Sequence, residues 1–163
     1  MNQSASWSFH ERDAERIAQR LRLFLGEAGA RTAILVDRTG QPLATVGEPP
    51  TFAPGAFASL TAADFSANDQ LARLLGEEEF GALFHQGERE SLYLADVARR
   101  VILVVLFDTR TTVGLVKLRV RPAVHDLTGI FQEMFEREDG HRPQVDASFV
   151  GEASDEIDKL FGR

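Results

Sequence analysis

The stretch SLYLADVARRVILVVLFDTRTTVGLVKLRV, residues 91–120, decides the fold class of this chain. It predicts three short strands, with turns at Val97–Arg100 and Asp108–Thr112. The middle run, Val101–Phe107, is apolar at every position, so a strand there must be buried on both faces. Apolar residues from elsewhere in the chain must therefore cover each side of the sheet.

The first third of the chain predicts a helix and two strands. Apolar positions over Ser8–Ala28 recur on one helical face, and the first residue of this range is the expected cap. Residues 31–37 and 41–46 predict two strands joined by a tight turn, and the first of them is apolar on both faces. Trp7 and Phe9 either pack on the first helical turn or cover a sheet edge, and the sequence leaves both options open.

A second helix is predicted over 56–75, after a loop at 47–55 that contains three prolines. The residues expected to be buried in it are Phe57, Leu60, Phe65, Leu71, Leu74 and Leu75. Its other face carries small or short, uncharged side chains: Ala62, Ala63, Ser66, Ala67 and Gln70. Such a face allows another backbone to approach closely. The helix propensity of alanine, or burial against the sheet, would also account for this composition.

Residues 76–85 are expected to form a connector that leads into the three strands. The last long helix is predicted to open at Pro122, because proline is favourable in a first turn, and to end at Asp139-Gly140. The predicted order is α-β-β-α-β-β-β-α. Two central strands buried on both faces, together with three helices, indicate a helix–sheet–helix sandwich of the α+β type over residues 1–140.

The remaining residues, 141–163, predict an acidic tail. A polar linker over His141–Ala153 leads to a short amphipathic helix over 154–162, with Ile157, Leu160 and Phe161 on one face. This helix is too short to be stable alone. Its apolar face is therefore expected either to pack on its own domain or to dock on a partner.

Composition excludes several classes of function. The net charge of −7 argues against nucleic acid or an anionic membrane as the main partner. The absence of cysteine excludes disulfides, thiolate metal sites and cysteine nucleophiles. The first residues do not resemble a signal peptide, and no apolar run is long enough to span a bilayer. We therefore expect a cytoplasmic protein.

No arrangement of residues for catalysis is evident, so we expect neither an enzyme nor a bound cofactor or metal. The four histidines fall on separate predicted elements, and His85 with Glu88 and Glu90 is the nearest approach to a metal site. The chain contains neither a P-loop nor a Gly-x-Ser-x-Gly motif. The arginines at exposed-looking positions, which could act on a nucleotide in trans, are Arg73, Arg99, Arg100 and Arg110, although surface arginines are common.

The predicted strand Ser91–Val97 is a candidate for pairing between two copies of the chain. It contains no proline, and if it lies at the sheet edge its unpaired backbone groups can bind a second strand. The residues of this candidate interface are Ser91, Leu92, Tyr93, Leu94 and Ala95. A covered interior strand is the alternative interpretation.

Seven segments, in order along nearly the whole chain, resemble the Roadblock / dynein light chain family. They are Ile34-Leu-Val-Asp37 with Gly40-Gln41, Ser59-Leu-Thr-Ala62, Leu71-Ala-Arg-Leu-Leu-Gly76, Ser91-Leu-Tyr-Leu94, Arg100-Val-Ile-Leu-Val-Val-Leu-Phe-Asp108, Thr112-Val-Gly-Leu-Val-Lys-Leu-Arg119 and Glu156-Ile-Asp-Lys-Leu-Phe161. Within this family the chain is similar to the bacterial members that activate a Ras-like small GTPase.

The resemblance implies a five-stranded antiparallel sheet with the first and last helices on one face and the second helix on the other. It also implies a homodimer paired through the third strand and second helix, which stimulates GTP hydrolysis in cell polarity or gliding motility, with a cell pole as the expected location. The GTPase contact would then fall on Ala63, Ser66, Ala67 and Gln70, with Ile157, Leu160 and Phe161 of the tail as a second contact.

Two other functions fit the same pattern. The family also contains dimeric scaffolds that do not stimulate hydrolysis. Ligand-sensing modules of the PAS or profilin type use a central sheet with flanking helices, but they need a polar-lined cavity, and the apolar run Val101–Leu106 argues against one.

Overall fold

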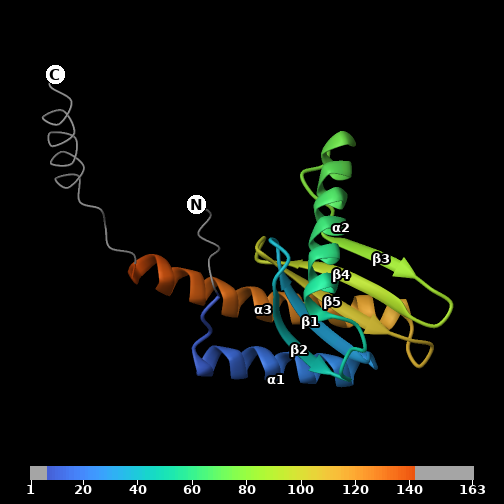
Figure 1. Cartoon of the computed structure of the whole chain (residues 1–163), viewed down its shortest axis with the longest axis horizontal. Coiled ribbons are helices and arrows are strands. Elements are labelled where there is room, and N and C mark those ends of the chain that lie inside the picture. The colour runs from blue at the N-terminus through green and yellow to red at the C-terminus, as the bar shows by residue number, and fades with distance from the viewer. Residues whose placement is uncertain (1–6, 142–163) are drawn as a thin grey trace, which may run out of the picture. The chain divides into compact units, whose positions relative to one another are not determined.

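The computed structural model describes residues 7–141, and the chain divides into two units, residues 1–132 and residues 133–163. The first unit contains a five-stranded antiparallel sheet in the order β2-β1-β5-β4-β3 (Figure 1). The elements are α1 (Glu11–Ala28), β1 (Thr32–Asp37), β2 (Pro42–Gly47), α2 (Pro54–Leu74), β3 (Ala82–Gln86), β4 (Ser91–Val97), β5 (Val101–Phe107) and α3 (Val113–His141).

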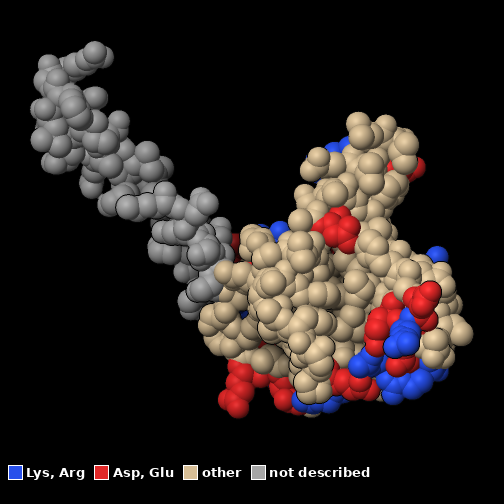
Figure 2. Space-filling model, turned by 45° about the vertical axis from the view of Figure 1, so that its right-hand side comes forward, with Lys and Arg blue, Asp and Glu red and all other residues tan. Residues whose placement is uncertain are grey.

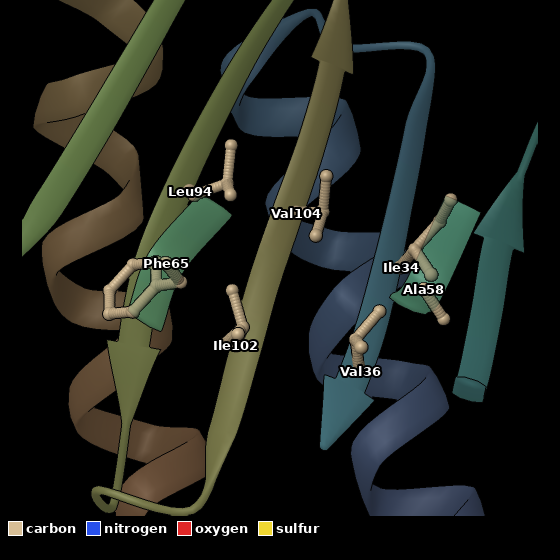
Figure 3. Packing of buried hydrophobic residues seen from close by; sticks show 7 residues of the cluster. All are labelled: Ile34, Val36, Ala58, Phe65, Leu94, Ile102 and Val104. Carbon is tan, nitrogen blue, oxygen red and sulfur yellow. The ribbon is translucent and has the colours of Figure 1, made fainter. Parts of the chain in front are cut away.

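The apolar run in β5 lies at the centre of the sheet, between β1 and β4, as its sequence predicts. Ile102 and Val104 face α2 and pack in one cluster with Phe65 of that helix (Figure 3). Leu103 and Val105 are also fully buried and, by strand alternation, face the opposite side. The central strand is therefore covered on both faces.

The three helices cover the two faces unequally. α1 and α3 lie on one face of the sheet and α2 lies on the other (Figures 1 and 3). This arrangement confirms the sandwich and the distribution of helices that the family resemblance implies. In the described part of the chain no helix is long and apolar enough to cross a membrane.

The prediction of a third strand at the end of residues 91–120 is wrong, because residues 113–120 form the first turns of α3. Thr112 caps this helix: its hydroxyl accepts the backbone N–H of Leu115 at 3.2 Å, and its carbonyl accepts the N–H of Val116 at 3.1 Å. The buried residues Val116 and Val120 are one helical turn apart. Pro122 therefore lies inside the helix and does not open it.

The remaining strand of the sheet is β3, and most of it lies within residues 76–85, the segment predicted to be a connector. It pairs with β4 from Ala82 opposite Ala95 to Gln86 opposite Ser91. β4 consequently lies between β3 and β5, with its backbone paired on both sides. Of the two interpretations of Ser91–Val97, the covered interior strand is the correct one, and β3 occupies the edge.

The start of α1 and the buried face of α2 also differ from the predictions. α1 begins at Glu11 with His10 as its N-cap, so Ser8 is not the cap. Trp7 packs against Phe9 and against Phe131 of α3, with ring centroids 5.9 Å apart in each pair. In α2, Phe65 is buried as predicted, together with Ala58, Thr61, Ala62, Asn68 and Ala72. Leu60, Leu71, Leu74 and Leu75 are exposed.

Candidate functional site: the outward face of α2 and the edge strand β3

The outward face of α2 is an apolar surface. At 100° per residue, Leu60, Ala63, Ala67, Leu71 and Leu74 fall on one line along the helix, opposite the buried Phe65. We call this line the α2 ridge. Leu60 is 72% exposed, Leu71 is 56% exposed and Leu74 is 83% exposed. Large exposed apolar patches of this kind mark interaction surfaces.

The ridge contains no charged residue and projects past the end of the sheet. The charged residues of α2 are Asp64, Asp69 and Arg73, and none of them lies on the ridge. The C-terminal half of α2 extends beyond the strands (Figure 1), and this part of the surface is mostly uncharged (Figure 2). A neutral apolar ridge is typical of the core of a protein–protein interface.

Arg38, in the turn after β1, holds α2 in place. Its Nη1 donates to Oδ2 of Asp69 at 2.8 Å, and its guanidinium lies 4.5 Å from the ring centroid of Phe65. Nη2 of the same residue donates to Asp96 in β4. One guanidinium thus links the β1–β2 turn, α2 and the sheet, which fixes the direction in which the ridge points.

Two further contacts connect α2 to the edge strand. Nε2 of His85 in β3 lies 2.6 Å from Oδ2 of Asp64 in α2. Nδ2 of the buried Asn68 donates to the carbonyl of Phe80 at 3.3 Å, just before β3 begins. These contacts link the ridge and the edge strand into one continuous surface.

The outer side of β3 has no neighbouring strand within the described residues. Phe84 of this strand is 37% exposed and stacks on Phe107 at 6.1 Å, so it stabilises the edge from one face. Unpaired backbone N–H and C=O groups at such an edge can bind a further strand. This edge could accept a second copy of the chain or a partner strand.

The three groups of residues predicted as binding sites have different outcomes in the structure. Ala63, Ser66, Ala67 and Gln70 are all exposed and lie on or beside the α2 ridge. The predicted pairing residues Ser91, Leu92, Tyr93, Leu94 and Ala95 lie in the interior strand β4, so they cannot pair with a strand of a second copy. Ile157, Leu160 and Phe161 lie outside the described residues.

The leucines of the ridge are functional candidates that sequence reasoning assigned to the core. α2 has apolar residues on both sides, so its periodicity does not say which side faces the sheet. The spacing of Leu60, Leu71 and Leu74 was the available signal, because it forms a stripe separate from the one that contains Phe65.

A groove of about 520 Å³ lies on the α2 face at the other end of the sheet. Phe52, Leu92 and Leu106 contribute apolar lining, while Arg31 and Glu90 contribute charge. Arg31 is already paired with Glu90 and, at 2.8 Å, with Glu48. The cationic side of the groove is therefore neutralised and offers no open site for an anionic ligand.

The same end of the molecule holds Arg110, one of the four candidate arginines. Its guanidinium contacts Asp108 at 3.0 Å and Glu48 at 3.2 Å, which raises the pKa of Arg110. The hydrogen bonds from Arg110 lower the pKa of Asp108, and those from Arg31 and then Arg110 lower the pKa of Glu48. Arg110 is thus held by acids of its own chain and is poorly placed to reach into a partner.

The described residues contain no group of three or more histidine or carboxylate side chains that could hold a metal ion.

Two more of the candidate arginines lie elsewhere on the surface. Arg99 follows the positive-φ residue Ala98 in the β4–β5 turn and lies 3.9 Å from Glu79. Arg73, in the last turn of α2, is exposed beside the ridge. Of the four candidate arginines, Arg73 alone belongs to α2 and is therefore the nearest in sequence to the α2 ridge.

Comparison with known families identifies the class of protein. Residues 7–107 match the Roadblock/LC7 domain, and this match covers every strand of the sheet. The chain belongs to the Roadblock/LC7 family.

Within this family the chain is similar to MglB. The Myxococcus xanthus MglB structure is 41% identical, with a TM-score of 0.69, and the match covers 72% of this chain and 96% of that one. The gliding protein MglB from Thermus thermophilus is 36% identical, with a TM-score of 0.73, over 78% of this chain and 97% of that one. An MglB solved in a tetrameric arrangement is also 36% identical, with a TM-score of 0.74, over 78% and 96%.

Profilin shares the fold alone. The Schizosaccharomyces pombe profilin matches with a TM-score of 0.53 at 15% identity, over 69% of this chain and 97% of that one. Comparison with curated proteins gave no significant match.

Proposed function

We propose that this chain is a GTPase-activating protein that works as a homodimer on a Ras-like small GTPase of the MglA type. One observation carries the proposal: an uncharged ridge on α2 adjoins an unpaired edge strand, in a chain 36–41% identical to MglB. The chain regulates the hydrolysis that its partner performs. A Roadblock scaffold without this activity is the alternative.

The homodimer forms through β3 and the leucines of the α2 ridge. Antiparallel pairing of two β3 strands extends the sheet across two copies and satisfies the backbone groups at the edge. Leu60, Leu71 and Leu74 are then removed from water, and full burial of an exposed leucine contributes about 2 kcal/mol. This pairing replaces the interface at 91–95 that the sequence predicted.

The GTPase binds on Ser66 and Gln70, which lie beside the ridge, and on Ala63 and Ala67, the small residues of the ridge between Leu60 and Leu71. These side chains are short, so the switch region can approach the helix backbone, and they lose little conformational entropy on docking. Arg38 keeps the helix fixed, which allows it to press on a mobile loop without being displaced. The proposed contact is a rigid surface that meets a flexible one.

The chain stimulates hydrolysis by positioning catalytic groups of the GTPase. Arg110 is engaged by two carboxylates, so no arginine finger is supplied from that side. Docking instead moves the switch loop so that the GTPase's own arginine and glutamine reach the γ-phosphate and the attacking water. A cis arginine brought into place contributes a rate increase of about 10³-fold or more.

The tail and the location belong to the same proposal and rest on the resemblance. Ile157, Leu160 and Phe161 dock on the GTPase away from its nucleotide and increase affinity. The protein works in the cytoplasm and concentrates at a cell pole in polarity or motility. Deletion of residues 154–163 tests the first point, because it should weaken the complex and leave the domain folded.

The decisive experiment measures single-turnover GTP hydrolysis by the cognate GTPase with and without this chain. Ser66→Arg places a long cation beside the ridge and should reduce stimulation at least about tenfold. Gln19→Arg, at an exposed position of α1 on the other face of the sheet, is the matched control and should stimulate like the native chain. The mass of each variant in solution should remain that of the dimer.

Two arginine variants separate positioning from an arginine finger. Arg73→Ala and Arg110→Ala should keep at least half of the stimulation at saturating concentration, as expected when the chain supplies no catalytic group. Loss of stimulation with unchanged binding in either variant would show that the chain supplies an arginine. Binding without stimulation by the native chain would favour the scaffold.

A further inference from the structure

The first turns of α3 carry a second exposed apolar surface, far from the α2 ridge in sequence. Leu118 is 61% exposed and Leu115 is 37% exposed, whereas Val116 and Val120 on the other side of the helix are buried. The helical angle places the two leucines opposite the buried stripe. α3 thus exposes two leucines to solvent at positions where polar residues would be compatible with the fold.

Basic side chains flank these leucines on both sides. At 100° per residue, Lys117 and Arg121 fall on one flank and Arg119 falls on the other. We call Leu115, Leu118 and these three residues the α3 patch. All three basic residues are exposed, and within the described part of the chain none of them is in an ion pair.

This concentration of positive charge is exceptional in the chain. The net charge is −7, yet residues 113–125 contain three basic residues and no acid. Elsewhere Arg20, Arg31, Arg38 and Arg110 are each paired with carboxylates. The α3 patch therefore suits a partner that is apolar along one line and acidic on both sides of it.

The chain itself contains a segment with this chemistry. In residues 154–162, a helical arrangement would align Ile157, Leu160 and Phe161 on one face. Glu156 and Asp158 would then flank this face on opposite sides. Lys159 would point away from it.

We propose that the α3 patch binds residues 154–162 of a second copy of this chain. Ile157, Leu160 and Phe161 pack on Leu115 and Leu118. The acids on either side of the segment pair with the cations on either side of the patch. The contact joins copies of the chain through a surface distinct from β3 and α2.

The dimensions of α3 favour a second copy over the same chain. From Leu118 to its last residue, His141, α3 contains about 35 Å of helix, measured along the chain at 1.5 Å per residue. Residues 142–156 span about 50 Å at full extension. A chain that returned to its own patch would have to straighten most of this length, which costs conformational entropy, whereas a neighbouring copy meets no such restriction.

The inference concerns the chain without any GTPase, so it does not rest on the proposed function. We expect Ile157, Leu160 and Phe161 to bind the α3 patch of another copy when no GTPase is bound. The salt dependence should be strong, because the ion pairs lie at an exposed surface.

The absence of cysteine allows a clean test on the full-length chain. One preparation carries His125→Cys, next to the patch and 89% exposed in its side chain, and the other carries Gly162→Cys. The two are mixed under mild oxidation, and the disulfide between them is measured by non-reducing electrophoresis. Because each chain has one cysteine, the mixed product forms only between copies.

The matched control replaces His125→Cys by Leu23→Cys, at an exposed position of α1. We expect the mixed disulfide to form about tenfold faster with His125→Cys than with Leu23→Cys. Adding Leu118→Asp, or Lys117→Glu with Arg121→Glu, to the first preparation should remove this advantage. Adding Leu23→Asp should not.

Three results would overturn the inference. The first is equal rates for the two cysteine positions. The second is a rate unaffected by Leu118→Asp. The third is binding of the native chain to vesicles rich in phosphatidylglycerol that is lost with Lys117→Glu and Arg121→Glu but survives deletion of residues 154–163, since this would assign the patch to an anionic membrane.

Discussion

Replacement of Asp37 by asparagine should destabilise the protein measurably and in a pH-dependent manner. Asp37 ends β1 and is only 4% exposed. Its Oδ1 accepts hydrogen bonds from the backbone N–H of Thr39 and of Gln41 at 2.9 Å each, and from the Thr39 hydroxyl at 2.8 Å. Its Oδ2 accepts the indole N–H of Trp7 at 2.8 Å. One carboxylate thus ties the N-terminal segment to the β1–β2 turn.

The size of the effect follows from these four bonds. In Asp37→Asn the amide oxygen can replace Oδ1, but the amide NH₂ then faces the indole N–H of Trp7, donor against donor. One hydrogen bond to a charged group is lost, worth about 1.5–3 kcal/mol, and the other three become weaker. We expect a loss of about 3 kcal/mol in the free energy of unfolding at pH 7.

The pH dependence has a definite sign. Burial on its own would raise the pKa of Asp37, but the hydrogen bonds from Gln41, Thr39 and Trp7 outweigh it and lower the pKa below its usual range. A depressed pKa in the folded state contributes stability that is fully present above the unfolded pKa, about 3.9, and is lost as the pH falls through the folded value. The difference between the native chain and Asp37→Asn should therefore be constant from about pH 5 to 7 and shrink below about pH 4.

Urea unfolding followed by far-UV circular dichroism measures the free energy at each pH. Trp7 is the only tryptophan, so its fluorescence reports separately on the N-terminal contact. Glu78→Gln, at an exposed position, is the control and should change the stability by less than about 0.5 kcal/mol. A loss below about 1 kcal/mol for Asp37→Asn, or a difference that does not shrink in acid, would refute the reasoning.

Two further substitutions test the backbone. Gly47 has a φ of 101°, and a Cβ built there would lie 2.2 Å from the carbonyl oxygen of Arg31, so Gly47→Ala should cost about 3 kcal/mol in thermal or urea unfolding; a loss no larger than that of an exposed surface substitution would contradict this. Pro122 lies within α3 and cannot donate the helical hydrogen bond, so Pro122→Ala should stabilise the chain by about 2 kcal/mol, and an unchanged or lower melting temperature would show that the helix already accommodates the ring at no cost.

Local sequence was sufficient for elements whose pattern has one interpretation. Seven consecutive apolar residues at 101–107, four of them β-branched, favour a strand covered on both faces, and β5 is that strand. The single apolar stripe of α1 was placed correctly to within three residues at its start. The family resemblance added the distribution of helices over the two faces, which no local pattern contains.

Residues 113–120 show where local sequence was ambiguous. Val113, Val116 and Val120 favour a strand by propensity, yet the same valines at 116 and 120 lie on one face of a helix. Thr112 resolves the choice, because its capping hydrogen bonds begin a helix that can bury this face. β3 was missed for the opposite reason: Ala82–Gln86 has only two large apolar residues, and its strand exists because β4 offers a free edge.

Local patterns in the sequence are enough to predict a sheet that is buried on both faces and covered by helices. These patterns do not say which strand lies at the edge of the sheet or which side of α2 faces water, because both depend on how the folded chain packs. Phe65 fills the space above Leu94 and Ile102, and once it does so Leu60 and Leu74 must point outward. Burial depends on surfaces that are distant in sequence, so two apolar sides of one helix cannot be distinguished until the sheet on which one of them packs has formed.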